Sequence, residues 1–251
     1  MRPRLALGAA VALSVVGAVW AVGADAPGGE HRASARPIVL AAASLTEVLR
    51  RIEPEASYSF GSSSSLAQQI RRGAPVDVYL SASPAYTRAL HREQVLRKPM
   101  AFATNSLVVI VSRSNPAKIR SVFDLARRPK LKLVVAGPKV PIGLYTREVL
   151  ERLGLLRVLE KTVSREPDVK GIVGKVALGQ ADAGFVYVTD AAPVASRVRA
   201  IAIPARAQPN VVYELAIATE PRDPAAARAF VSGVLGPDGR RELRAARFGL
   251  P

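Results

Sequence analysis

Short apolar runs of strand length alternate with segments of helical periodicity along most of this chain. The apolar runs predict strands at Ile38–Ala42, Tyr58–Phe60, Val76–Leu80, Leu107–Ser112, Leu131–Ala136, Ala183–Tyr187 and Val211–Ala218. The periodic segments predict helices at Thr46–Ile52, Leu66–Arg72, Pro84–Glu93, Tyr145–Leu153, Val169–Leu178, Ala225–Leu235 and Asp238–Ala246. This alternation favours an α/β fold built on largely parallel sheets.

Two strand-to-helix turns near the start of this pattern are rich in small and hydroxyl residues. The first spans residues 41–46, and the second spans residues 60–67 and contains four consecutive serines, Ser62 to Ser65. Turns of this kind direct backbone N–H groups and serine hydroxyls toward the positive end of a helix dipole. They predict a site for a small anion that needs no charged side chain.

Similar turns recur in the middle of the chain. Residues 138–143 lead into a helix, with Pro141 suited to its first turn. Asp168 is a good N-cap for the helix that begins at Val169. A third turn follows the strand that ends at Tyr187. Each turn alone is weak evidence, since capped helix starts occur in every α/β protein. Their convergence in one cleft is the sharper prediction.

The order of the elements predicts two lobes. Residues 37–112 and 210–251 form lobe one, and residues 113–209 form lobe two, with the long strands at 107–112 and 211–218 as the crossovers. A ligand cleft is then expected between the lobes, near the carboxyl ends of the strands.

The N-terminus predicts export. Arg2 and Arg4 precede the apolar run Leu5 to Val22, and residues 22–24 offer a cleavage site, so residues 1–24 are interpreted as a signal peptide. An uncleaved membrane anchor is the alternative, because the run is about the minimum length for a span. Residues 25–36 suit a disordered leader.

Composition narrows the chemistry. The chain has no cysteine and two histidines, which argues against disulfides, cysteine nucleophiles and a metal site. No catalytic serine, phosphate-binding glycine-loop or nucleic-acid-binding motif is present. The formal charge is +16, and residues 113–209 hold 18 basic against 8 acidic residues. Such a field could steer an anion or an acidic partner, and an arginine-rich solvated surface explains it equally well.

Five segments together resemble the periplasmic molybdate-binding proteins of ABC importers. They are Ala42-Ala43-Ser44-Leu45-Thr46, Gly61 to Ile70, Gly73 to Ala82, Val140 to Tyr145 and Val186 to Ala191. The motifs occur in the order of that family and cover nearly all of residues 37–251. The resemblance implies a two-lobed type II periplasmic binding protein fold, each lobe a largely parallel sheet flanked by helices, with the ligand in the cleft.

The resemblance also implies the oxyanion contacts. Carried over by position, they fall on Ser44, Ser63, Ile142, Val169 and Tyr187. The serines and Tyr187 would donate hydroxyl hydrogen bonds, and Ile142 and Val169 would donate backbone N–H groups. Ser62 or Ser64 could replace Ser63.

Three departures from the family pattern accompany these positions. Ile142 stands where a small residue is usual, which leaves the identity of the anion open. The segment from Thr46 to Phe60 is short, and Ser83 stands where an aspartate is common.

The expected function is capture of molybdate or tungstate by an exported, periplasmic, monomeric binding protein. It would have no catalytic residues, cofactor or nucleic-acid partner, and it would deliver the anion to the membrane permease of an ABC importer. A receptor for another anion such as sulfate is the alternative. Two other classes fit less well, because porphyrin-building deaminases of related fold need a cysteine and a regulator would need a DNA-binding region.

Overall fold

The computed structural model describes residues 36–251. The predicted signal peptide (1–24) and all but the last residue of the predicted leader (25–36) lie outside the described residues. Among the described residues, none of the helices is both long enough and apolar enough to span a membrane.

Lobe one is built on a five-stranded sheet with the strand order β2-β1-β3-β10-β4. Its strands are β1 (Ile38–Ala42), β2 (Ser57–Gly61), β3 (Val78–Ser81), β4 (Met100–Asn105) and β10 (Val211–Ile217). Strands β2, β1 and β3 are parallel, and β10 is antiparallel to both of its neighbours, β3 and β4. Four strands therefore run in one direction, and all four bring their carboxyl ends to the same edge.

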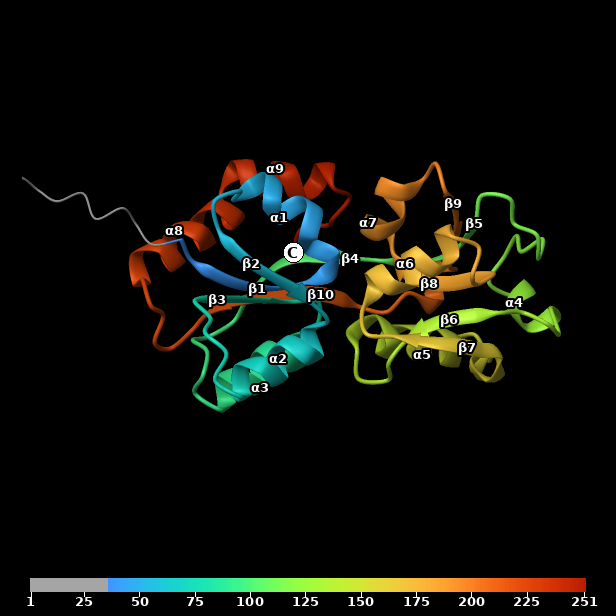
Figure 1. The fold of residues 1–251 in the computed structure, drawn as a ribbon, viewed down its shortest axis with the longest axis horizontal. Helices are drawn as coiled ribbons and strands as arrows, with labels where there is room; N and C mark the ends of the chain where they lie inside the picture. The colour runs from blue at the N-terminus through green and yellow to red at the C-terminus, as the bar shows by residue number, and fades with distance from the viewer. Residues whose placement is uncertain (1–35) are drawn as a thin grey trace, which may run out of the picture. The chain divides into compact units, whose positions relative to one another are not determined.

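Helices cover both faces of this sheet (Figure 1). They are α1 (Thr46–Ile52), α2 (Ser63–Arg71), α3 (Pro84–Arg92), α8 (Pro224–Leu235) and α9 (Pro237–Ala245). Helices α1, α8 and α9 pack together on one face, and α2 and α3 lie on the other. Buried side chains of α2 and α3, such as Leu66 and Leu90, form a hydrophobic cluster separate from the main core.

Lobe two repeats the arrangement with the order β7-β6-β8-β5-β9. Its strands are β5 (Leu107–Ser112), β6 (Leu133–Ala136), β7 (Thr162–Glu166), β8 (Ala183–Tyr187) and β9 (Val198–Ala202). Here β5 is the reversed strand, antiparallel to β8 and β9. The helices are α4 (Asp124–Arg127), α5 (Pro141–Arg152), α6 (Val169–Ala177) and α7 (Val188–Ala191), with 3-10 turns at η2 (Leu156–Lys161), η3 (Ala192–Val194) and η4 (Ala205–Ala207).

Two predicted boundaries are corrected. Strand β5 lies in the second sheet, so the crossing from lobe one occurs at about residue 106 and not after residue 112. Helix α5 begins at Pro141, four residues before the predicted start at Tyr145. Proline has no N–H to lose and a fixed φ, and both properties suit the first position of a helix.

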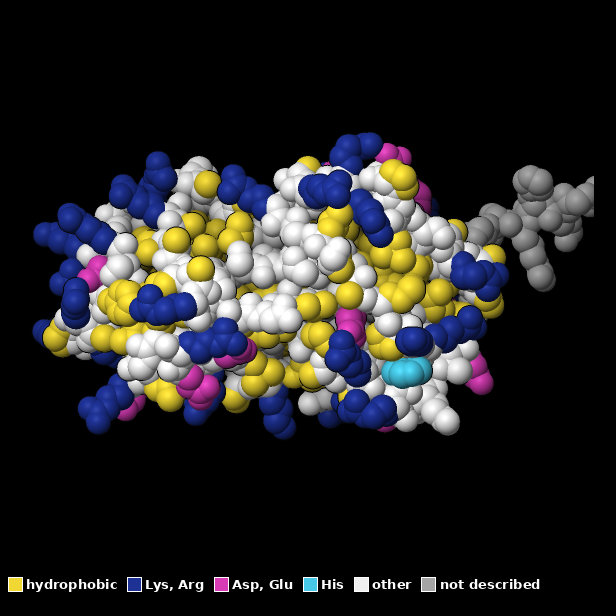
Figure 2. Space-filling model, turned by 180° about the vertical axis from the view of Figure 1, so that it is seen from behind, with side chains coloured by type: hydrophobic (Ala, Val, Ile, Leu, Met, Phe, Trp, Pro, Cys, Tyr) yellow, Lys and Arg dark blue, Asp and Glu magenta, His cyan; other side chains and the backbone are white. Residues whose placement is uncertain are grey.

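Basic side chains cover much of the surface. On the face shown in Figure 2, dark-blue Lys and Arg side chains spread over both lobes, and acidic side chains are sparse. The excess charge is therefore largely solvated and not gathered in the core.

Candidate functional site

The strand ends place the five predicted site residues in two groups, one in each lobe. Ala42 of β1 pairs with Gly61 of β2, so the turns after these strands, which carry Ser44 and Ser63, are neighbours. In lobe two, Ala136 of β6 pairs with Glu166 of β7, which aligns the loops leading to Ile142 and Val169.

Contacts across the lobes bring the two groups together. Helix α6, which begins at Val169, packs against the 3-10 turn η1 (Ala43–Leu45) that carries Ser44. The ring of Tyr187, at the end of β8, lies 5.9 Å from the ring of Tyr213 in lobe one. All five predicted residues are buried, none being more than 4% exposed. Their polar groups are therefore largely shielded from water.

A chain of side-chain hydrogen bonds reaches the Ser44 hydroxyl. The Ser106 N–H donates to Asn105 Oδ1, which identifies Asn105 Nδ2 as the donor toward Tyr213 Oη at 3.3 Å. Tyr213 Oη lies 2.9 Å from Ser44 Oγ, the acceptor available to the phenol proton among the described residues. Either hydroxyl can donate in this pair, and when Tyr213 donates, the proton of Ser44 is free to bind a ligand.

The Ser63 hydroxyl also accepts a hydrogen bond from the protein. The backbone N–H of Ala82 donates to Ser63 Oγ at 2.9 Å, while Tyr79 Oη donates to the Ser63 carbonyl at 2.7 Å. Ser62 Oγ instead accepts the Ser65 N–H as the N-cap of α2 and donates to Ser65 Oγ. The hydroxyl of Ser62 is therefore already used, whereas the proton of Ser63 is available.

The Tyr187 hydroxyl is buried without a hydrogen-bond partner among the described residues. An unsatisfied buried hydroxyl costs roughly 1–3 kcal/mol, so such a group in a native structure requires an explanation. Burial raises the pKa of Tyr187 well above 10, and the nearby Tyr213, Tyr145 and Asp190 add to the shift. The phenol therefore keeps its proton at neutral pH and can act as a donor.

Two helix starts supply backbone donors. Ile142 is the second residue of α5, and Val169 is the first residue of α6. First-turn N–H groups have no acceptor within their own helix. Asp168 Oδ1 caps the next two N–H groups of α6, those of Lys170 and Gly171, and leaves the Val169 N–H uncapped.

Three charged side chains lie beside these donors. Lys170 Nζ is 2.9 Å from both carboxylate oxygens of Glu47 and 3.2 Å from Asp190 Oδ1. Burial raises the pKa of Asp190 to about 6, against the lowering effect of the Lys170 ammonium. Burial lowers the pKa of Lys170, but the carboxylates of Asp190 and Glu47 together raise it above its ordinary value.

Sequence patterns missed these supporting residues. Asn105 and Tyr213 lie in strands and Glu47 and Lys170 in helices, and no local motif marks them. The buried carboxylate of Asp190 pairs with Lys170. Their roles depend on contacts between distant parts of the chain.

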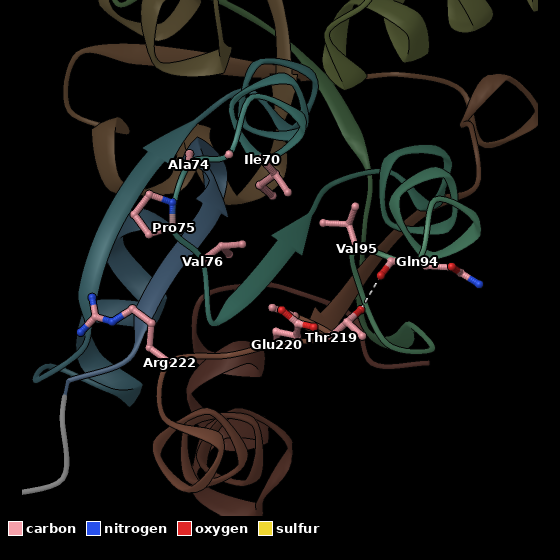
Figure 3. Close-up of a pocket in the computed structure, with 11 residues that line it drawn as sticks. Ile70, Ala74, Pro75, Val76, Gln94, Val95, Thr219, Glu220 and Arg222 are labelled. Carbon is pink, nitrogen blue, oxygen red and sulfur yellow. Dashed lines mark hydrogen bonds between the residues drawn. The ribbon is translucent and has the colours of Figure 1, made fainter.

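One hollow lies away from this site. The pocket in Figure 3, about 530 Å³, is lined by residues that include Val76 and Ala218, which precede β3 and follow β10. It therefore occupies the opposite edge of the sheet from Ser44. Within residues 36–251, no group of three or more His, Cys, Asp and Glu side chains could hold a metal ion.

Comparison with known proteins identifies the family. The family described as bacterial extracellular solute-binding proteins matches residues 38–248. The molybdate-binding protein ModA of Mycobacterium tuberculosis is 37% identical over 238 residues, covering 91% of this chain and 90% of its own. ModA of Escherichia coli is 32% identical over 233 residues, covering 84% and 87% respectively.

A solved structure supports the same relationship. The periplasmic molybdate-binding protein of Azotobacter vinelandii matches with a TM-score of 0.76 and 25% identity, over 86% of this chain and 100% of that one. The fold class and family resemblance drawn from the sequence are thereby confirmed. This chain belongs to the family of bacterial extracellular solute-binding proteins.

Proposed function

We propose that this protein captures a tetrahedral dianion, molybdate or tungstate, and delivers it to the membrane permease of an ABC importer. The anion would lie between the lobes, held by the hydroxyls of Ser44, Ser63 and Tyr187 and by the backbone N–H groups of Ile142 and Val169. The proposal is supported by relatives that are molybdate-binding proteins.

The observation that carries the proposal is the common polarity of the donors. Ser63 accepts a hydrogen bond from the protein and Tyr187 makes none, so both retain a proton for a ligand, and Ser44 retains its own when it accepts from Tyr213. Each hydrogen bond to a charged group contributes roughly 1.5–3 kcal/mol. Five such bonds offset much of the desolvation of a buried dianion.

The excess of donors over acceptors also gives selectivity. Phosphate near neutral pH keeps a proton, which needs an acceptor, and a hydroxyl that accepted this proton would have to turn its own proton away from that oxygen. Molybdate and tungstate carry no proton there. Sulfate carries none either, so it must be discriminated by size. Ile142, buried among hydrophobic core residues, is the position where we expect that discrimination.

The proposal assigns no catalytic residue and no cofactor, because the anion is cargo. It includes export through the N-terminal segment, a monomeric state and no nucleic-acid partner. Closure of the lobes would bury the anion, and the permease would recognise the closed form.

Thermal unfolding of the purified protein with molybdate, tungstate, sulfate or phosphate tests the proposal. A ligand at a hundred times its Kd stabilises by about 2.7 kcal/mol, equivalent to a Tm rise of about 5–11 °C for this size. We expect the rise with molybdate and tungstate only. Ser44→Ala combined with Tyr187→Phe should abolish it, whereas Ser59→Ala, at an exposed position of β2, should not. A rise with sulfate alone would transfer the function to sulfate, and no rise with any anion would refute oxyanion capture.

A further inference from the structure

A pair of charges joins the two lobes beside the proposed site. Glu47 belongs to α1 of lobe one, and Lys170 belongs to α6 of lobe two. The Lys170 ammonium lies 2.9 Å from both oxygens of the Glu47 carboxylate. Their side chains are 46% and 32% exposed, so the pair lies at the edge of the interface.

The pair connects two elements that carry proposed anion contacts. Glu47 lies three residues after Ser44, and Lys170 directly follows Val169. Helix α6 packs against the turn that carries Ser44. A bond between Glu47 and Lys170 therefore fixes the spacing between the Ser44 hydroxyl on one lobe and the Val169 N–H on the other.

Asp190, which belongs to lobe two like Lys170, holds the Lys170 ammonium in position for this contact. Its carboxylate is fully buried and lies 3.2 Å from Lys170 Nζ. Because Asp190 and Lys170 share a lobe, their pairing does not depend on closure. The ammonium is thus held in place before Glu47 reaches it, which reduces the side-chain entropy lost when the lobes close.

A pocket shows why this contact would matter for retention. It measures about 260 Å³ and is lined by residues of both lobes, among them Ser44, Glu47 and Thr189. Solvent therefore approaches Ser44 on the side where the charge pair stands. Separate interlobe contacts, from Tyr86 Oη to the Lys139 carbonyl and from Tyr145 Oη to the Ala82 carbonyl, do not involve the pair.

We propose that Glu47 and Lys170 form an interlobe latch, a pair of positioning residues that hold the closed form around the anion and slow its release. This inference rests on the proposed function and adds to it the residues that set residence time. The anion touches neither side chain. The latch acts by keeping Ser44 and Val169 at their closed spacing.

The latch predicts a specific kinetic signature. Glu47→Gln should raise the dissociation rate constant of molybdate about 3- to 30-fold, the range expected when a coupled contact within a network is lost. The association rate constant should change less than twofold, since the latch forms only on closure. The Tm of the ligand-free protein should match wild type. The matched control is Glu93→Gln, which removes an ion pair to Arg71 within lobe one.

Radiolabelled molybdate, preloaded and chased with excess unlabelled tungstate, gives the dissociation rate by rapid filtration. Lys170→Met leaves Asp190 without its partner and can impair folding, so Lys170 is tested in the Lys170→Met/Asp190→Asn background. There, adding Glu47→Gln should change the dissociation rate no further. If wild type retains molybdate and Glu47→Gln releases it as slowly as Glu93→Gln does, the latch is refuted and the proposed function stands. If wild type retains none, both are refuted.

Discussion

At the scale of single residues, the proposed site depends on the orientation of its hydroxyl protons. The Ser106 N–H fixes the Asn105 amide as a donor toward Tyr213, which can then donate to Ser44 and leave the Ser44 proton for a ligand. Neutral donors arranged in advance can stabilise a dianion without placing a counter-charge in the core.

Tyr213→Phe tests this chain. The substitution keeps the ring contacts with Tyr187 and Phe248 but removes the hydroxyl that bonds to Ser44 and accepts from Asn105. We expect the Kd for molybdate to rise about 5- to 30-fold, since the lost orientation of Ser44 is worth roughly 1–2 kcal/mol. Isothermal titration calorimetry measures the change.

The matched control is Tyr58→Phe. Its hydroxyl donates to the Leu49 and Glu53 carbonyls of lobe one and has no connection to Ser44. It should lower the Tm and leave the Kd unchanged. An unchanged Kd for Tyr213→Phe would show that Ser44 needs no partner to donate.

Sequence patterns predict residues of the proposed site but not the side-chain network around them. Ser44 and Ser63 stand at strand-to-helix turns, a local signal that a few consecutive residues carry. Tyr213 lies 169 positions from Ser44, and nothing in its neighbourhood along the chain indicates that the two hydroxyls meet. Local patterns identify helix starts, whereas side-chain networks are set by tertiary packing.

At the scale of elements, the helix starts are positioned by close backbone packing. Helix α5 approaches the end of β6 so closely that a Cβ at Gly143 would lie 2.3 Å from the Gly137 carbonyl oxygen and 2.9 Å from that of Ala136. Both neighbours are backbone atoms, so they cannot move aside as a flexible side chain would. Glycine at this position therefore sets where the Ile142 N–H lies.

Gly143→Ala should displace α5 from the sheet. We expect a loss of roughly 1–3 kcal/mol in the free energy of unfolding, typical of overpacking, together with weaker molybdate binding because Ile142 moves. Denaturant unfolding and calorimetry measure the two effects.

Gly174→Ala is the matched control. It lies inside α6, where no atom lies within 4 Å of the added Cβ. Alanine should stabilise that helix by about 0.4–1 kcal/mol without changing affinity. Equal behaviour of the two variants would contradict the positioning role of Gly143.

The strands that the sequence did not predict are edge strands. Strands β4, β7 and β9 each have one neighbour, and residues of β7 such as Val163 and Arg165 are exposed. Edge strands are only partly covered, so their sequences lack the continuous apolar run that identified β5 and β8. Central strands can be predicted from the sequence because both of their faces are buried, which requires a continuous apolar run.

At the scale of the whole molecule, the two lobes are built on sheets of five strands each, and each sheet contains one reversed strand. Those strands, β5 and β10, are the two predicted as crossovers, and each directly follows a passage between lobes. The sequence placed both strands within a residue but assigned β5 to the wrong lobe, because an apolar run does not reveal which sheet it joins.

The pH dependence of the free energy of unfolding should include a contribution from Asp190. Its pKa is about 6 in the folded state, against an ordinary value of 3.8, chiefly because burial disfavours the charged form. The folded state therefore binds this proton more tightly than the unfolded state does. Wild-type stability should lose a contribution as the pH rises from about 4 to 6, and the loss should be complete above that range.

Asp190→Asn isolates this contribution. Other carboxylates, such as Glu93 and Asp124, have pKa values lowered by hydrogen bonds and make the stability rise with pH. They do so in wild type and in the variant alike, so the difference between the two proteins reports Asp190. The variant should gain roughly 3 kcal/mol relative to wild type between pH 4 and pH 7, the free energy of a shift of about two pKa units. Denaturant unfolding at a series of pH values measures the difference. A difference that stays constant from pH 4 to pH 7 would mean that Asp190 titrates alike in both states, and that the ammonium of Lys170 fully compensates for its burial.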